Sequence, residues 1–131
     1  PFLPALDGAR PPLQFVHVGD VAAAFVELAL GDAEGAFNVA PNDWLSLDEV
    51  ARIAGKRVVS VPSRLIAPIL DIGARVLPPH LRAPAAMMPY LKHPFVLSAA
   101  RLMASTAWRP RLSSADTLRD LLSRRSGGVL L

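Results

Sequence analysis

The stretch that most constrains the fold is QFVHVGDVAAAF, which starts at Gln14, because its hydrophobic period changes within two residues. Its first part is an apolar run of β-forming residues, and the apolar residues after Asp20 recur at helical spacing. Asp20 can accept hydrogen bonds from backbone N–H groups of the first helical turn, and its negative charge suits the helix dipole. We therefore expect a strand over 14–18 and a helix over about 20–30 capped by Asp20, as in α/β proteins whose helices cover a parallel sheet.

Two further helices carry N-terminal caps in the sequence. Ser46 and Glu49 have the S-x-x-E spacing of a capping box, in which each side chain bonds the other's backbone N–H. Gly55 is suited to end that helix. Ser113 with Asp116 repeats the capping pattern before a last amphipathic segment. The spacing predicts one helix that begins after Ser46 and another that begins after Ser113.

The remaining segments predict an alternation of strands and helices. Residues 78–94 are too rich in proline to form one regular element, and we expect a loop there. A long apolar helix is expected before this loop and a short helix capped by Ser98 after it. Short strands are expected at three places, namely AFNVA at 36–40, RVVSVP at 57–62 and FVL at 95–97. The alternation indicates the α/β class.

The composition limits the kind of protein this chain can be. Its 131 residues, of which 52% are hydrophobic, suffice for one domain with a packed core. The absence of cysteine excludes disulfides and thiolate zinc sites and suits the reducing cytoplasm, where we expect the protein to reside. His80 and His93 lack carboxylate or cysteine companions at ligand spacing, so we expect no metal site.

Charge and hydropathy exclude further classes. The net charge of +3 comes from basic residues spread along the chain rather than clustered with aromatic residues, so we expect no nucleic-acid partner. No apolar run approaches the ~18 to 20 residues that a bilayer span requires, and we expect no transmembrane segment. A serine hydrolase is excluded because no serine stands in a G-x-S-x-G elbow.

Three segments occur in this order along the chain: FVHVGDVAAAF, GAFNVAPNDWLSLDEVARIAG and RLMASTAWRPRLSSADTLRDLL. Together they resemble the C-terminal third of the extended short-chain dehydrogenase/reductases, the NAD-dependent epimerase/dehydratase family. In that family a strand reading roughly F-V-H-V-D-D-V-A feeds a helix and G-x-Y/F-N-V-A/G forms the next strand. A capped S-x-x-E helix follows, and L-G-W-x-P with a capped helix closes the chain. The resemblance covers most of residues 13–123. It implies that residues 1–131 are a single C-terminal substrate-binding region of a Rossmann-type protein, with 78–94 as a loop within it and the N-terminal Rossmann part absent.

The resemblance also implies where the chemistry of such a protein lies. Members bind NAD or NADP at a G-x-x-G-x-x-G turn, and no glycines here have that spacing. Their catalytic Tyr-x-x-x-Lys pair is absent too, because Tyr90, the only tyrosine, has Pro94 at the fourth position after it. We therefore expect a parent enzyme of the oxidoreductase or isomerase type. The fragment alone should have no catalytic or cofactor-binding residue and no activity.

The resemblance implies only a few residues that contact substrate. The arginine that commonly precedes the F-V-H-V strand and contacts a sugar-nucleotide diphosphate is replaced by Leu13 or Gln14, and Arg82 could substitute only if the loop register shifts. Met87 would suit a more apolar substrate. The candidates for substrate contact are Gln14, Arg82, Met87, Tyr90 and His93.

Two functions of different classes stay open. The first is the substrate-binding portion of an NAD(P)-dependent epimerase, dehydratase or reductase that acts on a sugar nucleotide or on a more apolar carbonyl or alcohol. Its partners would be the small-molecule substrate, the missing Rossmann part and a second copy of the chain in a homodimer. The second is a non-catalytic binding module of the same architecture, which would use the apolar region at 63–95 against a partner or a membrane surface.

Overall fold

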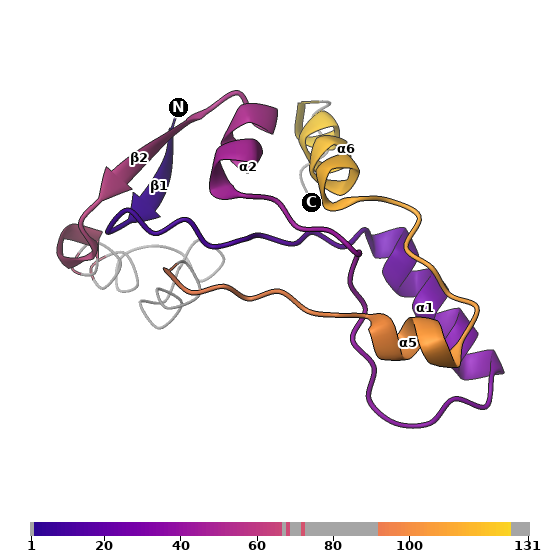
Figure 1. The fold of residues 1–131 in the computed structure, drawn as a ribbon. Coiled ribbons are helices and arrows are strands. Elements are labelled where there is room, and N and C mark those ends of the chain that lie inside the picture. Colours follow the sequence, from indigo (N-terminus) through magenta and orange to yellow (C-terminus); the bar gives the residue numbers. More distant parts are fainter. Residues whose placement is uncertain (1, 67, 69–71, 73–91, 127–131) are drawn as a thin grey trace. The chain divides into compact units, whose positions relative to one another are not determined.

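The computed structural model describes residues 2–66, 68, 72 and 92–126, and within them the protein is of mixed α/β class. These residues belong to two compact units. We call Pro1–Pro11 with Ser46–Phe95 the sheet unit, and Pro12–Leu45 with Val96–Leu131 the helical unit. The elements are β1 (Phe2–Leu6), α1 (Val18–Leu30), α2 (Leu47–Ile53), β2 (Arg57–Val61), α5 (Ala100–Ser105) and α6 (Ser114–Ser126), and Figure 1 labels them.

The sheet unit is built on two parallel strands, β1 and β2 (Figure 1). Phe2 pairs with Arg57 at one end and Leu6 with Val61 at the other. The β-branched run of β2 favours an extended chain, as the sequence predicts. The sequence did not indicate β1, because Pro4 at its centre removes a backbone donor. Helix α2 packs on both strands, and the apolar side chains Ala5 and Leu6 of β1 are almost fully buried.

Helix α2 has the ends that its sequence predicts. The Ser46 side chain accepts the Glu49 backbone N–H, and the Glu49 carboxylate accepts the Ser46 N–H at 2.8 Å, so the capping box is present. At the other end Gly55 has φ +63°, and the N–H of Lys56 reaches the Ala51 carbonyl at 2.8 Å. This bond and that of the Gly55 N–H to the Arg52 carbonyl form a Schellman motif, which satisfies the last helical carbonyls.

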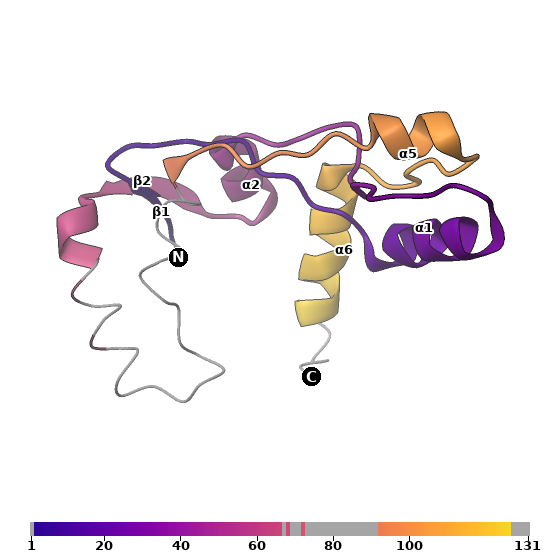
Figure 2. The ribbon, with the colours of Figure 1, turned by 90° about the horizontal axis from the view of Figure 1, so that it is seen from below.

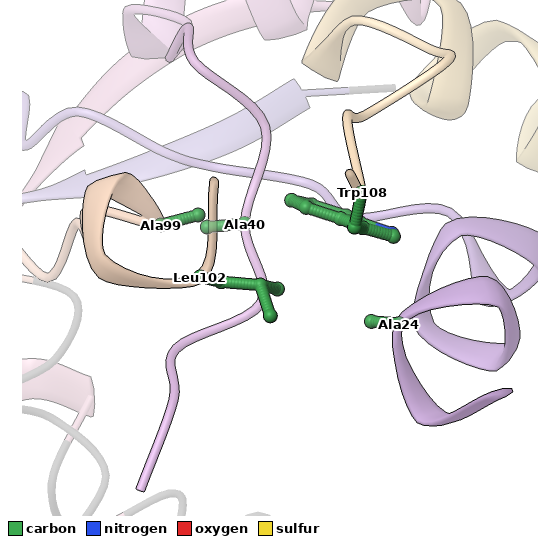
Figure 3. Close-up of a cluster of buried hydrophobic side chains, with 5 residues drawn as sticks. All are labelled: Ala24, Ala40, Ala99, Leu102 and Trp108. Atoms are coloured by element: carbon green, nitrogen blue, oxygen red, sulfur yellow. The ribbon is translucent and has the colours of Figure 1, made fainter. Parts of the chain in front are cut away.

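The helical unit packs around one tryptophan. Figure 3 shows the Trp108 ring between Ala24 of α1 on one side and the α5 region with Ala99 and Leu102 on the other. These residues and Ala40 are almost completely buried. Figures 1 and 2 show α5 beside α1 at the same end of this unit. The small side chains of the three alanines allow the backbone segments to approach the large indole ring closely.

Three predicted strands are not strands in the structure. Residues 14–17 belong to no strand, and beside them Leu13 forms only a single antiparallel bridge with Leu45. Residues 36–40 and 95–97 are also irregular. In two of these segments side chains make the contacts that a neighbouring strand would have made. The Gln14 amide bonds both backbone groups of Leu97, and the Asn38 amide bonds the Ser98 carbonyl.

The prediction that Asp20 caps α1 is wrong. The helix begins at Val18, and the capping residue is His17, whose Nδ1 accepts the Gly19 N–H at 3.1 Å. Asp20 lies in the first turn and is buried, with its carboxylate directed to another segment. The predicted cap of α5 is also displaced by one residue, because that helix follows Ala99 and the Ser98 hydroxyl only accepts the Ala100 N–H at 3.3 Å. Ser113 does accept the Asp116 N–H at 3.1 Å where α6 begins.

The predicted apolar helix and the proline-rich loop fall mainly on residues that the structure does not describe. Residues 63–66 form a helical turn, but the remainder of the region up to 91 lies outside the described residues apart from 68 and 72. In the described part of the chain, none of the helices combines the length and the apolar character needed to cross a bilayer.

Candidate functional site

Asp20 ties the start of α1 to the loop that follows α5. Its carboxylate accepts the backbone N–H of Arg111 at 3.2 Å and that of Leu112 at 3.3 Å. Its backbone carbonyl accepts the indole N–H of Trp108 at 2.9 Å. The side chain is 2% exposed, so these bonds replace those it would make to water. One residue therefore fixes both the tryptophan of the core and the chain that leads into α6.

Ser114 makes a second connection, at the first residue of α6. Its N–H donates to the Asp43 carboxylate at 3.0 and 3.1 Å, and its hydroxyl donates to the Asp43 carbonyl at 3.2 Å. The same hydroxyl accepts the N–H of Phe15 at 3.3 Å. Ser114 is completely buried, so its polar atoms are satisfied by these two distant segments. The chain before α1, the loop after 40 and the start of α6 are thereby held together.

Gln14, a predicted substrate contact, has a structural role. Its side-chain oxygen accepts the Leu97 N–H at 2.9 Å, and its nitrogen donates to the carbonyls of Pro41 and Leu97 at 2.9 and 3.1 Å. Both amide hydrogens and the oxygen are therefore engaged by backbone. The side chain therefore positions two loops, and both of its amide hydrogens are already used.

A shallow hollow of about 160 Å³ lies beside these loops in the helical unit. Its wall includes Trp44, which is 57% exposed, together with Asn42 and Ser98. An exposed indole next to an amide and a hydroxyl can hold a small ring-shaped molecule by face contact and by hydrogen bonds. The exposure of Trp44 is a feature that the pattern of the chain did not indicate.

The structure does not place the other predicted site residues in one unit with Gln14. Arg82, Met87 and Tyr90 lie outside the described residues. His93 is exposed in the sheet unit, whereas Gln14 belongs to the helical unit. Next to His93, Lys92 pairs with Asp7, and Asp7 also accepts the Ser63 N–H at 2.8 Å. The Lys92 ammonium and the Ser63 hydrogen bonds hold the pKa of the Asp7 carboxyl well below its usual range.

The polar residues that organise the helical unit were missed at the sequence level. Asp43 and Ser114 are ordinary loop and helix-start residues in the sequence, and no spacing rule pairs residues so far apart. Of these residues, only Trp108 could be expected from its residue type to make a hydrogen bond in the core, since a buried indole N–H requires an acceptor. In the described part of the chain, no three histidine or acidic side chains come together in a way that could hold a metal ion.

Comparison of the chain with models of known protein families and with curated protein sequences gives no match.

Proposed function

We propose that this chain is the C-terminal, substrate-binding portion of an NAD(P)-dependent epimerase, dehydratase or reductase of the extended short-chain dehydrogenase/reductase type. In this proposal a Rossmann-type part encoded upstream binds NAD or NADP and supplies the catalytic tyrosine and lysine. The residues described above contribute to the substrate side. The substrate is a sugar nucleotide or a more apolar carbonyl or alcohol.

The observation that carries the proposal is the mutual bonding of the segments that resemble the family. Residues of FVHVGDV, FNVAPND and AWRPRLSS lie far apart in the sequence but bond one another in the helical unit. Asp20 of the first segment accepts the indole N–H of Trp108 of the third, and Asp43 of the second accepts the N–H of Ser114 of the third. A chance likeness of short motifs gives no reason for their polar residues to be one another's partners, whereas a shared fold does.

The sheet unit supports the same proposal. A parallel pair of strands is normally part of a larger sheet covered on both faces, because such pairs arise from β–α–β connections. In the described residues β1 and β2 form a sheet of two strands with α2 packed against it. We propose that strands of the upstream part extend this sheet.

The proposal is tested by sequencing the reading frame that encodes Pro1 and by measuring nucleotide binding and turnover of the full-length protein. The frame should contain upstream a glycine-rich turn between a strand and a helix and, nearer to Pro1, a Tyr-x-x-x-Lys pair. The full-length product should bind NADH or NADPH, measured as energy transfer from protein tryptophan to the bound nicotinamide. Replacement of that tyrosine by phenylalanine should abolish turnover and leave nucleotide binding intact.

A different result would refute the proposal. If the frame lacks both motifs and the full-length product binds neither nucleotide, the enzymatic proposal fails. The non-catalytic binding module would then be the better account of this chain.

A further inference from the structure

The two strands of the sheet unit differ in what their outer edges offer to another strand. In a parallel pair, every second residue of each strand directs its N–H and C=O to the neighbouring strand, and the residues between them direct theirs outward. The Asp7 N–H bonds the Val61 carbonyl at 2.9 Å, and Leu6 lies in register with Val61, so the odd-numbered residues of both strands bond one another. The outward residues are therefore the even-numbered ones, namely Phe2, Pro4 and Leu6 on β1 and Val58 and Ser60 on β2.

The outer edge of β1 does not suit a further strand. Pro4, at the centre of this edge, has no N–H to donate. The Leu6 carbonyl is already used, because it accepts the Ala9 N–H at 2.9 Å in the turn that follows β1. Proline at an outward position is one of the features by which edge strands avoid further pairing. β1 therefore has the character of a strand at the end of a sheet.

The outer edge of β2 is open. Val58 and Ser60 each direct one N–H and one C=O outward, and no backbone group in the described part of the chain bonds them from that side. The β2 sequence RVVSV has no proline, and its Val59 side chain is 44% exposed. Valine-rich strands of parallel sheets usually lie in the interior of a larger, covered sheet. β2 therefore has the composition of an interior strand, and the described residues supply a neighbour on one side only.

We propose that a strand from the upstream part of the polypeptide joins this sheet along β2, so that β2 lies between that strand and β1. The chemistry of the edge identifies its occupant, because an extended polypeptide presents N–H and C=O groups at the spacing of those of Val58 and Ser60. The inference rests on the proposed function, which supplies the upstream part, and it adds the edge at which that part binds. It excludes the β1 edge, although segments adjacent in the sequence usually lie side by side in a sheet.

Amide hydrogen exchange, followed by NMR, tests this arrangement in the full-length protein and in the chain of residues 1–131. The Val58 and Ser60 amides should exchange about tenfold more slowly in the full-length protein, because each then donates to the added strand. The Phe2 amide, which faces outward on β1, is the matched control, and its exchange should change much less.

Variants test the same edge through stability. Ser60→Pro removes an outward donor but no bond to β1, so it should lower the urea midpoint of the full-length protein and change that of the chain of residues 1–131 much less. Ser60→Ala keeps the N–H and should have little effect in either protein. Phe2→Pro removes an outward donor from β1 and should also have little effect.

The results separate this inference from the proposed function. A full-length protein that binds NADH or NADPH but leaves the Val58 and Ser60 amides unprotected would overturn this inference and leave the proposed function standing. Protected amides in a full-length protein that binds neither nucleotide would confirm the added strand and refute the enzymatic function alone. Protection that arises in the chain of residues 1–131 as its concentration rises would mean that a second copy occupies the edge, which overturns the inference. Protection of Phe2 in place of Val58 and Ser60 would overturn it as well.

Discussion

Asp20 shows how much of the helical unit depends on one buried carboxylate. Asp20→Ala would leave the N–H groups of Arg111 and Leu112 without their acceptor. Hydrogen bonds to a charged group contribute about 1.5 to 3 kcal/mol each, so we expect a loss of about 3 kcal/mol of unfolding free energy, measured by urea denaturation. Asp20→Asn keeps one acceptor oxygen and should cost less. Asp32→Ala, in an exposed loop, is the matched control and should have an effect near zero.

The hydrogen bond from the Trp108 indole to the Asp20 carbonyl is the second contact that joins Asp20 to the chain after α5. Trp108→Phe keeps most of the ring that packs on Ala24 but removes the indole N–H donated to the Asp20 carbonyl. We expect a loss of about 1 kcal/mol for the hydrogen bond, with a further contribution from the smaller ring. The measurement is denaturation followed by far-ultraviolet circular dichroism, since the variant alters the fluorescence. Unchanged stability would mean that the indole bond contributes nothing net.

At the scale of elements, the C-terminal end of α2 depends on a backbone angle. Gly55 has φ +63°, and a Cβ added there would meet no atom within 4 Å. Gly55→Ala therefore introduces backbone strain without a steric clash, and we expect it to destabilise the protein by about 1 kcal/mol. Gly55→Asn should cost less, because asparagine adopts this region more readily. Equal costs for the two variants, measured by denaturation, would contradict the explanation.

The N-terminal end of α2 should make it sensitive to acid. Hydrogen bonds from the Ser46 backbone and hydroxyl lower the pKa of Glu49. Because the folded pKa lies below the unfolded value of about 4.3, this stabilisation is complete above that value and is lost as the pH falls through the folded pKa. Ser46→Ala removes the hydroxyl bond, so the pKa of Glu49 should rise part of the way toward its ordinary value. A carbon-detected NMR titration of the Glu49 carboxyl measures this rise, and an unchanged pKa would contradict it.

Local patterns predicted the helices better than the strands. The capping box of α2 and the serine before α6 follow from contacts three residues apart, so the sequence around each end contains the information. The strand prediction at 14–18 failed because the bonding partners of that segment are the side chain of Ser114 and the backbone of Leu97, which no local period reveals. Asp20 was taken for a cap because a capping aspartate and one that bonds a distant loop occupy similar positions in a sequence.

The candidate sites also depend on contacts between segments that are distant in the sequence. Gln14 was predicted from its place before the FVHV segment, but its amide is engaged by two loops that meet only in the folded chain. A groove that residues 14–18 form with Thr117 and Leu121 of α6 could not be predicted, since it brings together segments about a hundred positions apart. Sequence patterns therefore indicated where α2 and α6 begin, and the tertiary fold decided which polar side chains are engaged by distant segments.

At the scale of the whole molecule, the proposed function predicts incomplete coverage of the isolated chain. Large apolar side chains are more than half exposed in both units, among them Phe2, Phe25, Leu30, Trp44 and Phe95. If upstream strands and helices cover part of this surface, the 131-residue chain alone should bind an apolar fluorescent dye strongly and the full-length protein should bind less per molecule. A chain that melts cooperatively as a monomer and binds no dye would count against the proposal.

The two units are interleaved along the chain, and this has a consequence for how the protein can vary. The helical unit is interrupted after Leu45 and resumes at Val96, and Gln14 bonds the backbone close to both points, at Pro41 and Leu97. The polypeptide thus leaves and re-enters the helical unit at neighbouring positions, but the sheet unit also contains Pro1–Pro11 from before the helical unit begins. Because β1 in that first segment pairs with β2, residues 46–95 can change in length or sequence only while they keep a strand that matches β1.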